Sequence, residues 1–240
     1  MALIFCESRT KQNPFRAAPG AWPVDHCDQF CVCIPAAHPE HHRMLTDDQA
    51  LAALKDLLLA RSIFRGNFTL ASGAKSNYYV DCRLTTFDAQ GAWLIGQSVR
   101  AVIRREAAAR SLRIDSVGGL TMGADPIALA TGMFSQFAGD NPPFRVFAVR
   151  KAAKGHGQGK LIEANFKKGD SVVIIEDTIT SGASALNAIE AVQKEGGKIA
   201  FVVALVDREE GGRKNIEALG HSVFSLFTRS ALLPDLAPAA

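Results

Sequence analysis

The sequence predicts an α/β fold with a central, mainly parallel sheet flanked by helices, and two observations carry this prediction. Apolar strands alternate with helical segments from about residue 114 to the C-terminus. The expected strands 171–176 and 200–206 contain continuous apolar runs, VVII at 172–175 and all of 200–206, which are typical of strands buried on both faces. Ligands of such sheets bind beyond the carboxyl ends of the strands, so we expect the functional residues there.

The N-terminal part of this fold is predicted to be a helix followed by a hairpin. Leucines spaced three and four residues apart predict a helix over residues 46–64. Thr46 and Gln49 have the spacing of a capping box at its start. Two short strands, at 67–70 and 77–83, follow and are separated by a turn-like cluster of small residues.

The remaining elements alternate as a parallel α/β fold requires. The first of them is a helix at 88–110 that ends in basic residues, as the helix dipole favours. The helix at 183–195 is followed by two glycines, which end it. Strands are expected at 114–118, 144–149, 171–176, 200–206 and 222–227, and helices at 88–110, 123–131, 183–195 and 213–219.

The composition divides the 240 residues into two unlike segments. Four of the five cysteines, four of the six histidines and half of the prolines precede Met44. We expect residues 1–43 to be a disordered extension, and Met44 is a candidate natural start; residues 44–240 form the predicted functional domain. A zinc site on Cys27, Cys31 and Cys33 is the alternative, although no second ligand pair completes the pattern.

The composition also excludes some classes of function. A net charge of +3 is too weak by itself to indicate a nucleic-acid partner. No apolar run approaches the 18 residues of a membrane-spanning helix, so no membrane partner is expected either.

The most informative stretch, residues 172–184, reads VVIIEDTITSGAS. Its apolar strand leads into Glu176 and Asp177, then into a loop of small hydroxyl residues around Gly182, and then into a helix. The unpaired backbone N–H groups of a helix N-terminus suit a phosphate. Two adjacent carboxylates suit a ribose diol or a nearby magnesium ion. The alternative is a solvated turn in which Thr180 caps the helix.

A second motif lies just upstream. Residues 145–168 contain seven basic residues and one acidic residue, and within them KGHGQGK, residues 154–160, has three glycines. We expect a mobile basic loop that closes over a polyanion, in which His156 could donate to or protonate a phosphate oxygen. The alternative is a solvated basic loop.

These two motifs resemble those of a known family. The 172–184 stretch is similar to the phosphoribosyl pyrophosphate (PRPP) motif of type I phosphoribosyltransferases, and residues 149–157, VRKAAKGHG, look like the catalytic loop of orotate phosphoribosyltransferases. The hairpin segment 68–81 and the loop 119–126 resemble further parts of that family. The resemblance covers about residues 46–232 and implies an N-terminal hood of helix plus hairpin beside the parallel sheet.

The resemblance assigns roles residue by residue. Catalysis falls to Lys154, His156 and Asp177, and Asp177 would contact Mg²⁺ indirectly, through PRPP and water. Orotate binding falls to Thr180, Arg208, Tyr78 and Tyr79, although a strand turns only one of two adjacent tyrosines toward a given pocket. PRPP binding falls to Arg150, Lys151, Lys154, His156, Glu176, Asp177, Thr178, Thr180, Ser181, Gly182, Ala183 and Ser184. Ala71 and Gly123 stand where some members have pyrophosphate-binding lysines.

The implied activity is transfer of the phosphoribosyl group from PRPP to orotate, giving orotidine 5′-monophosphate and pyrophosphate with Mg²⁺ as cofactor. In the family the basic loop reaches the neighbouring subunit's site, so a homodimer is implied. A lone cysteine in the domain, Cys82, agrees with a cytoplasmic location. Two rivals are a transferase for another base, such as a purine, against which Arg208 argues, and a PRPP-sensing regulator that binds nucleic acid, against which the intact basic loop argues.

Overall fold

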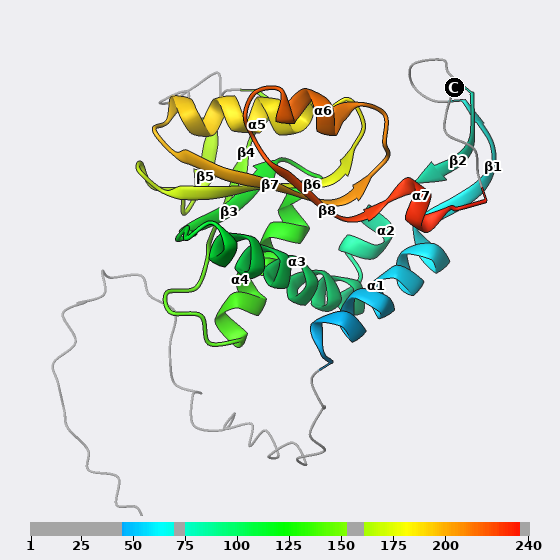
Figure 1. The fold of residues 1–240 in the computed structure, drawn as a ribbon, viewed down its shortest axis with the longest axis horizontal. Helices are drawn as coiled ribbons and strands as arrows, with labels where there is room; N and C mark the ends of the chain where they lie inside the picture. The colour runs from blue at the N-terminus through cyan, green and yellow to red at the C-terminus, as the bar shows by residue number, and fades with distance from the viewer. Residues whose placement is uncertain (1–44, 70–74, 153–160, 236–240) are drawn as a thin grey trace, which may run out of the picture. The chain divides into compact units, whose positions relative to one another are not determined.

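The computed structural model describes residues 45–69, 75–152 and 161–235 (Figure 1). Several predictions therefore lie outside the described residues. They concern the 1–43 extension with its zinc alternative, Ala71 in the hairpin turn, and the loop residues Lys154 and His156.

A six-stranded sheet organises the domain, in the order β5-β4-β3-β6-β7-β8. The neighbouring strands pair in parallel except β5, which runs antiparallel to β4. The predicted mainly parallel sheet is therefore confirmed. The strands span Ser116–Leu120 (β3), Arg145–Val149 (β4), Ile162–Ala164 (β5), Ser171–Ile179 (β6), Lys198–Asp207 (β7) and Val223–Thr228 (β8).

Helices cover both faces of this sheet (Figure 1). Figure 1 places α5 and α6 above the sheet and α1, α3 and α4 below it. Two short helices, α2 and α7, stand in the chain after the second and the last strand. The helices span Asp47–Arg61 (α1), Arg83–Thr86 (α2), Ala89–Ala109 (α3), Ala124–Phe137 (α4), Ala183–Lys194 (α5), Gly212–Glu217 (α6) and Arg229–Leu232 (α7).

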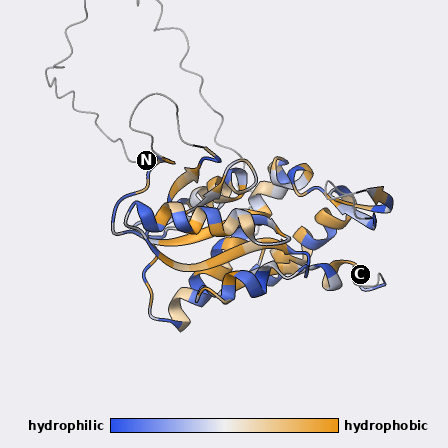
Figure 2. Ribbon diagram, turned by 90° about the horizontal axis from the view of Figure 1, so that it is seen from above, coloured by the Kyte–Doolittle hydropathy of each residue, from blue (hydrophilic) through white to orange (hydrophobic). Residues whose placement is uncertain are grey.

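Alternate residues of β6 feed two separate hydrophobic cores. Val173 and Ile175 pack into the core that α1, α3 and α4 share, whereas Val172 and Ile174 pack into the core under α5. Successive side chains of a strand point to opposite faces, so a strand between two helical layers must be apolar throughout. Figure 2 shows the sheet as a hydrophobic layer between the helices.

The predicted N-terminal helix and hairpin are both present. The capping box is confirmed, because the backbone N–H of Gln49 donates to Thr46 Oγ1 at 3.2 Å and that of Thr46 to Gln49 Oε1 at 3.0 Å. After α1, strands β1 (Ile63–Thr69) and β2 (Lys75–Val80) pair antiparallel in a sheet of their own.

Some predicted boundaries were wrong. The first helix ends at Arg61, not near residue 64, because the next residues pair with β2, and Phe64 lies opposite Tyr79. The second strand ends at Val80, and α4 continues past the predicted end at residue 131 to Phe137. The short elements β5, α2 and α7 were not predicted. None of the helices in the described ranges combines the length and hydropathy needed to cross a membrane.

Candidate active site

The acidic pair lies inside the last part of β6 rather than after it, because the strand continues to Ile179. The following loop turns at Gly182, whose φ of 81° is in the left-handed region that favours glycine. A Cβ on Gly182 would lie 2.9 Å from the carbonyl oxygen of Gly212. Gly182 is therefore required here by both backbone conformation and space, and α5 begins directly after it.

Burial dominates the electrostatics of this pair. Glu176 is only 5% exposed, and burial, with the neighbouring charge of Asp177, raises its pKa to about 8. Burial also raises the pKa of Asp177, although the backbone N–H of Thr178 donates to Asp177 Oδ1 at 2.7 Å and opposes the effect. Groups that bring positive charge or hydroxyl donors to these two oxygen-rich side chains would stabilise their ionised forms.

The loop that enters α4 packs directly against Asp177. A Cβ on Gly123 would lie 2.7 Å from both Cγ and Oδ1 of Asp177. In the same loop, Thr121 Oγ1 donates to Asp125 Oδ2 at 2.5 Å. The structure thus brings two of the predicted segments, the 119–126 loop and the acidic pair, into one site, with the side chain at 123 reduced to hydrogen.

The side chain of Thr178 packs against Cys82, two residues after β2. Thr178 Oγ1 lies 3.3 Å from Cys82 Sγ, and the Cys82 thiol lies 3.9 Å from the carbonyl oxygen of Asp177. Cys82 is 2% exposed, and burial raises its pKa to about 12. This contact fixes the segment after β2 against the acidic end of β6.

Arg208 directly follows the neighbouring strand of the sheet, β7, which ends at Asp207. The backbone N–H of Arg208 donates to the carbonyl oxygen of Ile179 at 3.0 Å, which ties it to the end of β6. The guanidinium lies 5.3 Å from the centre of the Tyr78 ring, and its Nη2 is 2.7 Å from Glu210 Oε1. The Arg208 side chain is 10% exposed, so a cation is held at the edge of the core beside an aromatic ring.

The two adjacent tyrosines of β2 face opposite ways. Tyr78 is 1% exposed and carries Arg208 over its ring. Tyr79 is 38% exposed and packs beside Phe64 and Phe68, with ring centres 6.5 and 5.7 Å away. Of the two, Tyr78 is the one that the structure brings to Arg208.

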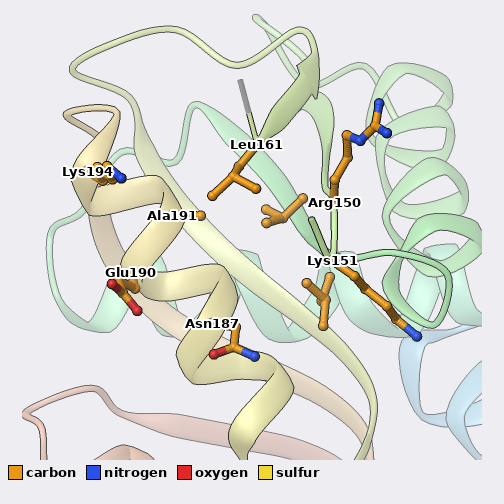
Figure 3. Close-up of a pocket in the computed structure, with 9 residues that line it drawn as sticks. Arg150, Lys151, Leu161, Asn187, Glu190, Ala191 and Lys194 are labelled. Atoms are coloured by element: carbon orange, nitrogen blue, oxygen red, sulfur yellow. The ribbon is translucent and has the colours of Figure 1, made fainter. Parts of the chain in front are cut away.

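The first residues of the basic loop follow β4 and border a different pocket. Arg150 and Lys151 lie at the rim of a cavity of about 430 Å³ against α5, whose Glu190 forms part of the far wall (Figure 3). Figure 3 shows both basic side chains pointing away from α5, and Arg150 Nη1 lies 3.1 Å from Glu163 Oε1. In the described residues, this pocket is lined by neither member of the acidic pair.

Comparisons with known proteins identify the family. No family model matches the chain. It is 44% identical to an orotate phosphoribosyltransferase of Aquifex aeolicus over 166 residues, which are 69% of this chain and 86% of that one. It is 42% identical to the enzyme of that name from Rhodopirellula baltica over 178 residues, 74% and 91% of the two chains. The chain belongs to the orotate phosphoribosyltransferase family.

Solved structures of this family share the fold. The Mycobacterium tuberculosis orotate phosphoribosyltransferase matches at 38% identity and a TM-score of 0.65, covering 76% of this chain and 98% of that one. The same protein in complex with PRPP matches at 36% identity and a TM-score of 0.61, with the same coverage. The Aeropyrum pernix protein matches at 27% identity and a TM-score of 0.64, covering 75% and 96% of the two chains.

One residue near the acidic pair was not predicted from the sequence. Arg83, the first residue of α2, has an electrostatic interaction with Asp177. Its only signal in the sequence is an aspartate two residues earlier, at Asp81, which binds it. A pattern so common at helix starts does not by itself indicate a ligand site.

Proposed function

We propose that this protein is an orotate phosphoribosyltransferase of de novo pyrimidine synthesis. It joins a ring nitrogen of orotate to the anomeric carbon of PRPP, breaks the bond from that carbon to pyrophosphate, and yields orotidine 5′-monophosphate. The observation that carries the proposal is the pairing of Arg208 and Tyr78 at the end of β7, beside the acidic pair on β6. An arginine over an aromatic ring suits a planar anion such as orotate.

PRPP would bind along the end of β6. Glu176 and Asp177 would accept hydrogen bonds from the two ribose hydroxyls, which relieves the cost of ionising them in a buried position. The loop and the start of α5 would bind the 5′-phosphate through backbone N–H groups and hydroxyls. This part of the proposed site comprises Thr178, Thr180, Ser181, Gly182, Ala183 and Ser184.

Mg²⁺ fits the acidic pair, because it prefers oxygen ligands and usually keeps several waters. The described residues contain no group of three or more side chains that could hold a metal by themselves. Asp177 would therefore meet the ion through water and PRPP oxygens. The bound ion would neutralise charge on the departing pyrophosphate. Asp177 itself, beside Gly123, would stabilise positive charge that develops on the ribose.

Orotate would lie between β7 and the hood. The carboxylate of orotate would form an ion pair with the guanidinium of Arg208, and the Tyr78 ring would hold that guanidinium in place. Thr180, next to Ile179, would contact the base from the β6 side. An uncharged purine offers no carboxylate to this arginine, so the geometry favours orotate over a purine.

The basic loop is proposed to contact the pyrophosphate group of PRPP that is bound in the neighbouring subunit. The residues proposed for this contact are Arg150, Lys151, Lys154 and His156. Because such contacts matter most as the leaving group departs, Lys154→Ala should lower kcat far more than it weakens PRPP binding. Steady-state kinetics beside direct binding measurements test this. A variant with weakened PRPP binding and an unchanged kcat would contradict the role.

An exposed apolar surface supports the proposed homodimer. Leu129, Met133 and Phe137 follow one face of α4 and are 55%, 66% and 59% exposed. Trp93 of α3 is 44% exposed and packs edge-on against Phe137 with ring centres 5.0 Å apart. Met122, which is 60% exposed, lies in the loop that enters α4 and contacts Asp177. A second copy seated here would lie close to the PRPP site.

Two further proposals concern the chain as a whole. The catalytic domain would be residues 44–240, since the relatives match about 70 to 77% of the chain. A cytoplasmic location would suit an enzyme of small soluble metabolites whose Cys82 stays a free thiol.

The test is consumption of orotate, followed by its absorbance, after addition of PRPP and Mg²⁺, with adenine and hypoxanthine as alternative bases. We expect orotate alone to react. Arg208→Gln should raise the KM for orotate about 10-fold to 100-fold, the range for lost hydrogen bonds to a charged group. Arg113→Gln is the matched control, because Arg113 is exposed and pairs with Asp115 before β3, at the other end of the sheet. Failure to consume orotate, or equal use of a purine, would refute the proposal.

A further inference from the structure

Arg83 is held in one orientation by Asp81. Its Nε lies 2.8 Å from Asp81 Oδ1, and its Nη2 lies 2.8 Å from Oδ2, so the two side chains meet as a bidentate pair. The backbone N–H of Arg83 also donates to Oδ1 at 3.1 Å. The Asp81 side chain is 17% exposed and that of Arg83 is 59% exposed. The pair therefore presents a fixed guanidinium to solvent.

The residue between them anchors this pair at the acidic end of β6. The thiol of Cys82 contacts both the hydroxyl of Thr178 and the carbonyl oxygen of Asp177. The fold thus brings Arg83 from the hood to the side of the acidic pair. Burial raises the pKa of Asp177, and the charge of Arg83 opposes this effect. The pKa of Arg83 is raised by the hydrogen bond to Asp81 and, less strongly, by the charges of Tyr79 and Asp177.

A cation near this position would favour the binding of an anionic ligand beside the acidic pair. PRPP is a polyanion, yet the residues at the end of β6 are two carboxylates. Each arginine of the proposed site has a carboxylate partner: Asp81 for Arg83, Glu210 for Arg208 and Glu163 for Arg150. The charge of Arg83 nevertheless acts on Asp177. Gly123 adds no charge beside Asp177.

The Arg83 guanidinium has N–H donors that do not bind Asp81 and could bind such a ligand. A guanidinium carries five N–H groups, and the bidentate pair with Asp81 takes two of them. Three N–H groups therefore remain on an exposed, oriented fork, the geometry that suits a phosphate oxygen.

We propose that Arg83, oriented by Asp81, binds the pyrophosphate group of PRPP beside Asp177. This inference rests on the proposed function. The 5′-phosphate of PRPP is assigned to the loop around Gly182, which follows the acidic pair in the chain. Arg83 lies near Asp177 of the acidic pair itself, so we assign it to the other phosphate group of PRPP, the pyrophosphate. Asp81 is a positioning residue, since it acts through Arg83.

Calorimetric titration of the full-length protein tests the proposal, with PRPP, pyrophosphate and orotidine 5′-monophosphate as separate ligands in the presence of Mg²⁺. Arg83→Ala should weaken binding of PRPP and of pyrophosphate about 10-fold to 100-fold, because a charge-assisted hydrogen bond is lost. Binding of orotidine 5′-monophosphate, which has no pyrophosphate, should stay within about twofold, since Arg83 is assigned no contact with it. Arg83→Lys should retain part of the affinity, and Asp81→Asn should lose less than Arg83→Ala.

Arg104→Ala is the matched control, because Arg104 is similarly exposed, at 61%, and pairs with Asp140 away from the acidic pair. It should leave all three affinities unchanged. Unchanged PRPP binding by Arg83→Ala would overturn the inference alone. Equal weakening of all three ligands would also overturn it, since that result indicates general damage to the site. A wild-type protein that binds no PRPP would instead refute the proposed function.

Discussion

Replacing Glu176 by glutamine should stabilise the ligand-free protein by an amount that depends on pH. Burial raises the pKa of Glu176 from its ordinary 4.5 to about 8, so the folded protein holds this proton more tightly than the unfolded chain does. The stability contributed by the neutral carboxyl is full below pH 4.5 and is lost as the pH rises through about 8. Glutamine stays neutral throughout and avoids this loss.

The structure sets the size of the effect. Between pH 4.5 and 8 the free energy of unfolding of the variant should gain on that of the wild type by about 1.4 kcal/mol per pH unit. The gain should level off above pH 8 at about 5 kcal/mol, an upper value for a side chain that is 5% exposed. The same variant should bind PRPP more weakly, because an amide accepts fewer hydrogen bonds from the ribose.

Urea denaturation followed by circular dichroism, at pH 5, 7 and 9, measures this difference. Glu190→Gln is the matched control, because Glu190 is exposed on α5 and should give the same stability as the wild type at every pH. If Glu176→Gln is no more stable than the wild type at pH 9, or if its advantage does not grow with pH, the reasoning about the buried carboxyl is refuted.

Three other predictions follow from the described contacts. Gly123→Ala should raise the KM for PRPP about 10-fold or more in steady-state assays, because its Cβ would lie 2.7 Å from the Asp177 carboxylate and displace it; an unchanged KM would contradict the close packing. Met133→Glu should convert the dimer to a monomer in sedimentation velocity and lower the activity. Leu219→Glu is the control, because Leu219 is 63% exposed after α6, and it should change neither property. A fully active Met133→Glu monomer would exclude this surface as a dimer interface that activity needs. Native Cys82 should resist iodoacetamide at pH 8 while the unfolded chain reacts, by peptide mass spectrometry, because the thiol is buried and its pKa is about 12; stoichiometric labelling of the native protein would show that the thiol is accessible.

The parts of the fold that were predictable are those in which local sequence and tertiary burial agree. Within the predicted strand 171–176, residues 172–175 are all apolar because β6 lies between two helical layers, so this pattern alone predicted a buried strand. Thr46 and Gln49 cap α1 through contacts three residues apart, which a local motif can specify.

The errors in the predicted fold occur where pairing with residues distant in the sequence determines the local structure. Phe64 continues the apolar pattern of the preceding helix, yet it is in a strand because Tyr79 pairs with it across the hairpin. The strand β5 has three residues and depends on β4 for its hydrogen bonds. Such short segments carry no periodicity of their own.

The candidate site divides in the same way. Glu176 and Asp177 adjoin a phosphate-type loop in the chain, so their chemistry could be interpreted from the sequence. Arg83 reaches the same place through the contact between Cys82 and Thr178, 96 residues apart in the chain. The choice between Tyr78 and Tyr79 likewise needed the position of Arg208.

Two backbone hydrogen bonds join the end of β6 and the residue after it to the segment that follows β7. The N–H of Arg208 donates to Ile179 at 3.0 Å, and that of Gly212 donates to Thr180 at 2.8 Å. The segment from Arg208 to Gly212 therefore has to place two N–H groups, four residues apart, opposite the carbonyl oxygens of the adjacent residues Ile179 and Thr180. Adding or deleting a residue in the 209–211 segment would break one of these bonds and move the arginine relative to the phosphate loop. The length of the 209–211 segment is thus a constraint on the site, in addition to the identity of its side chains.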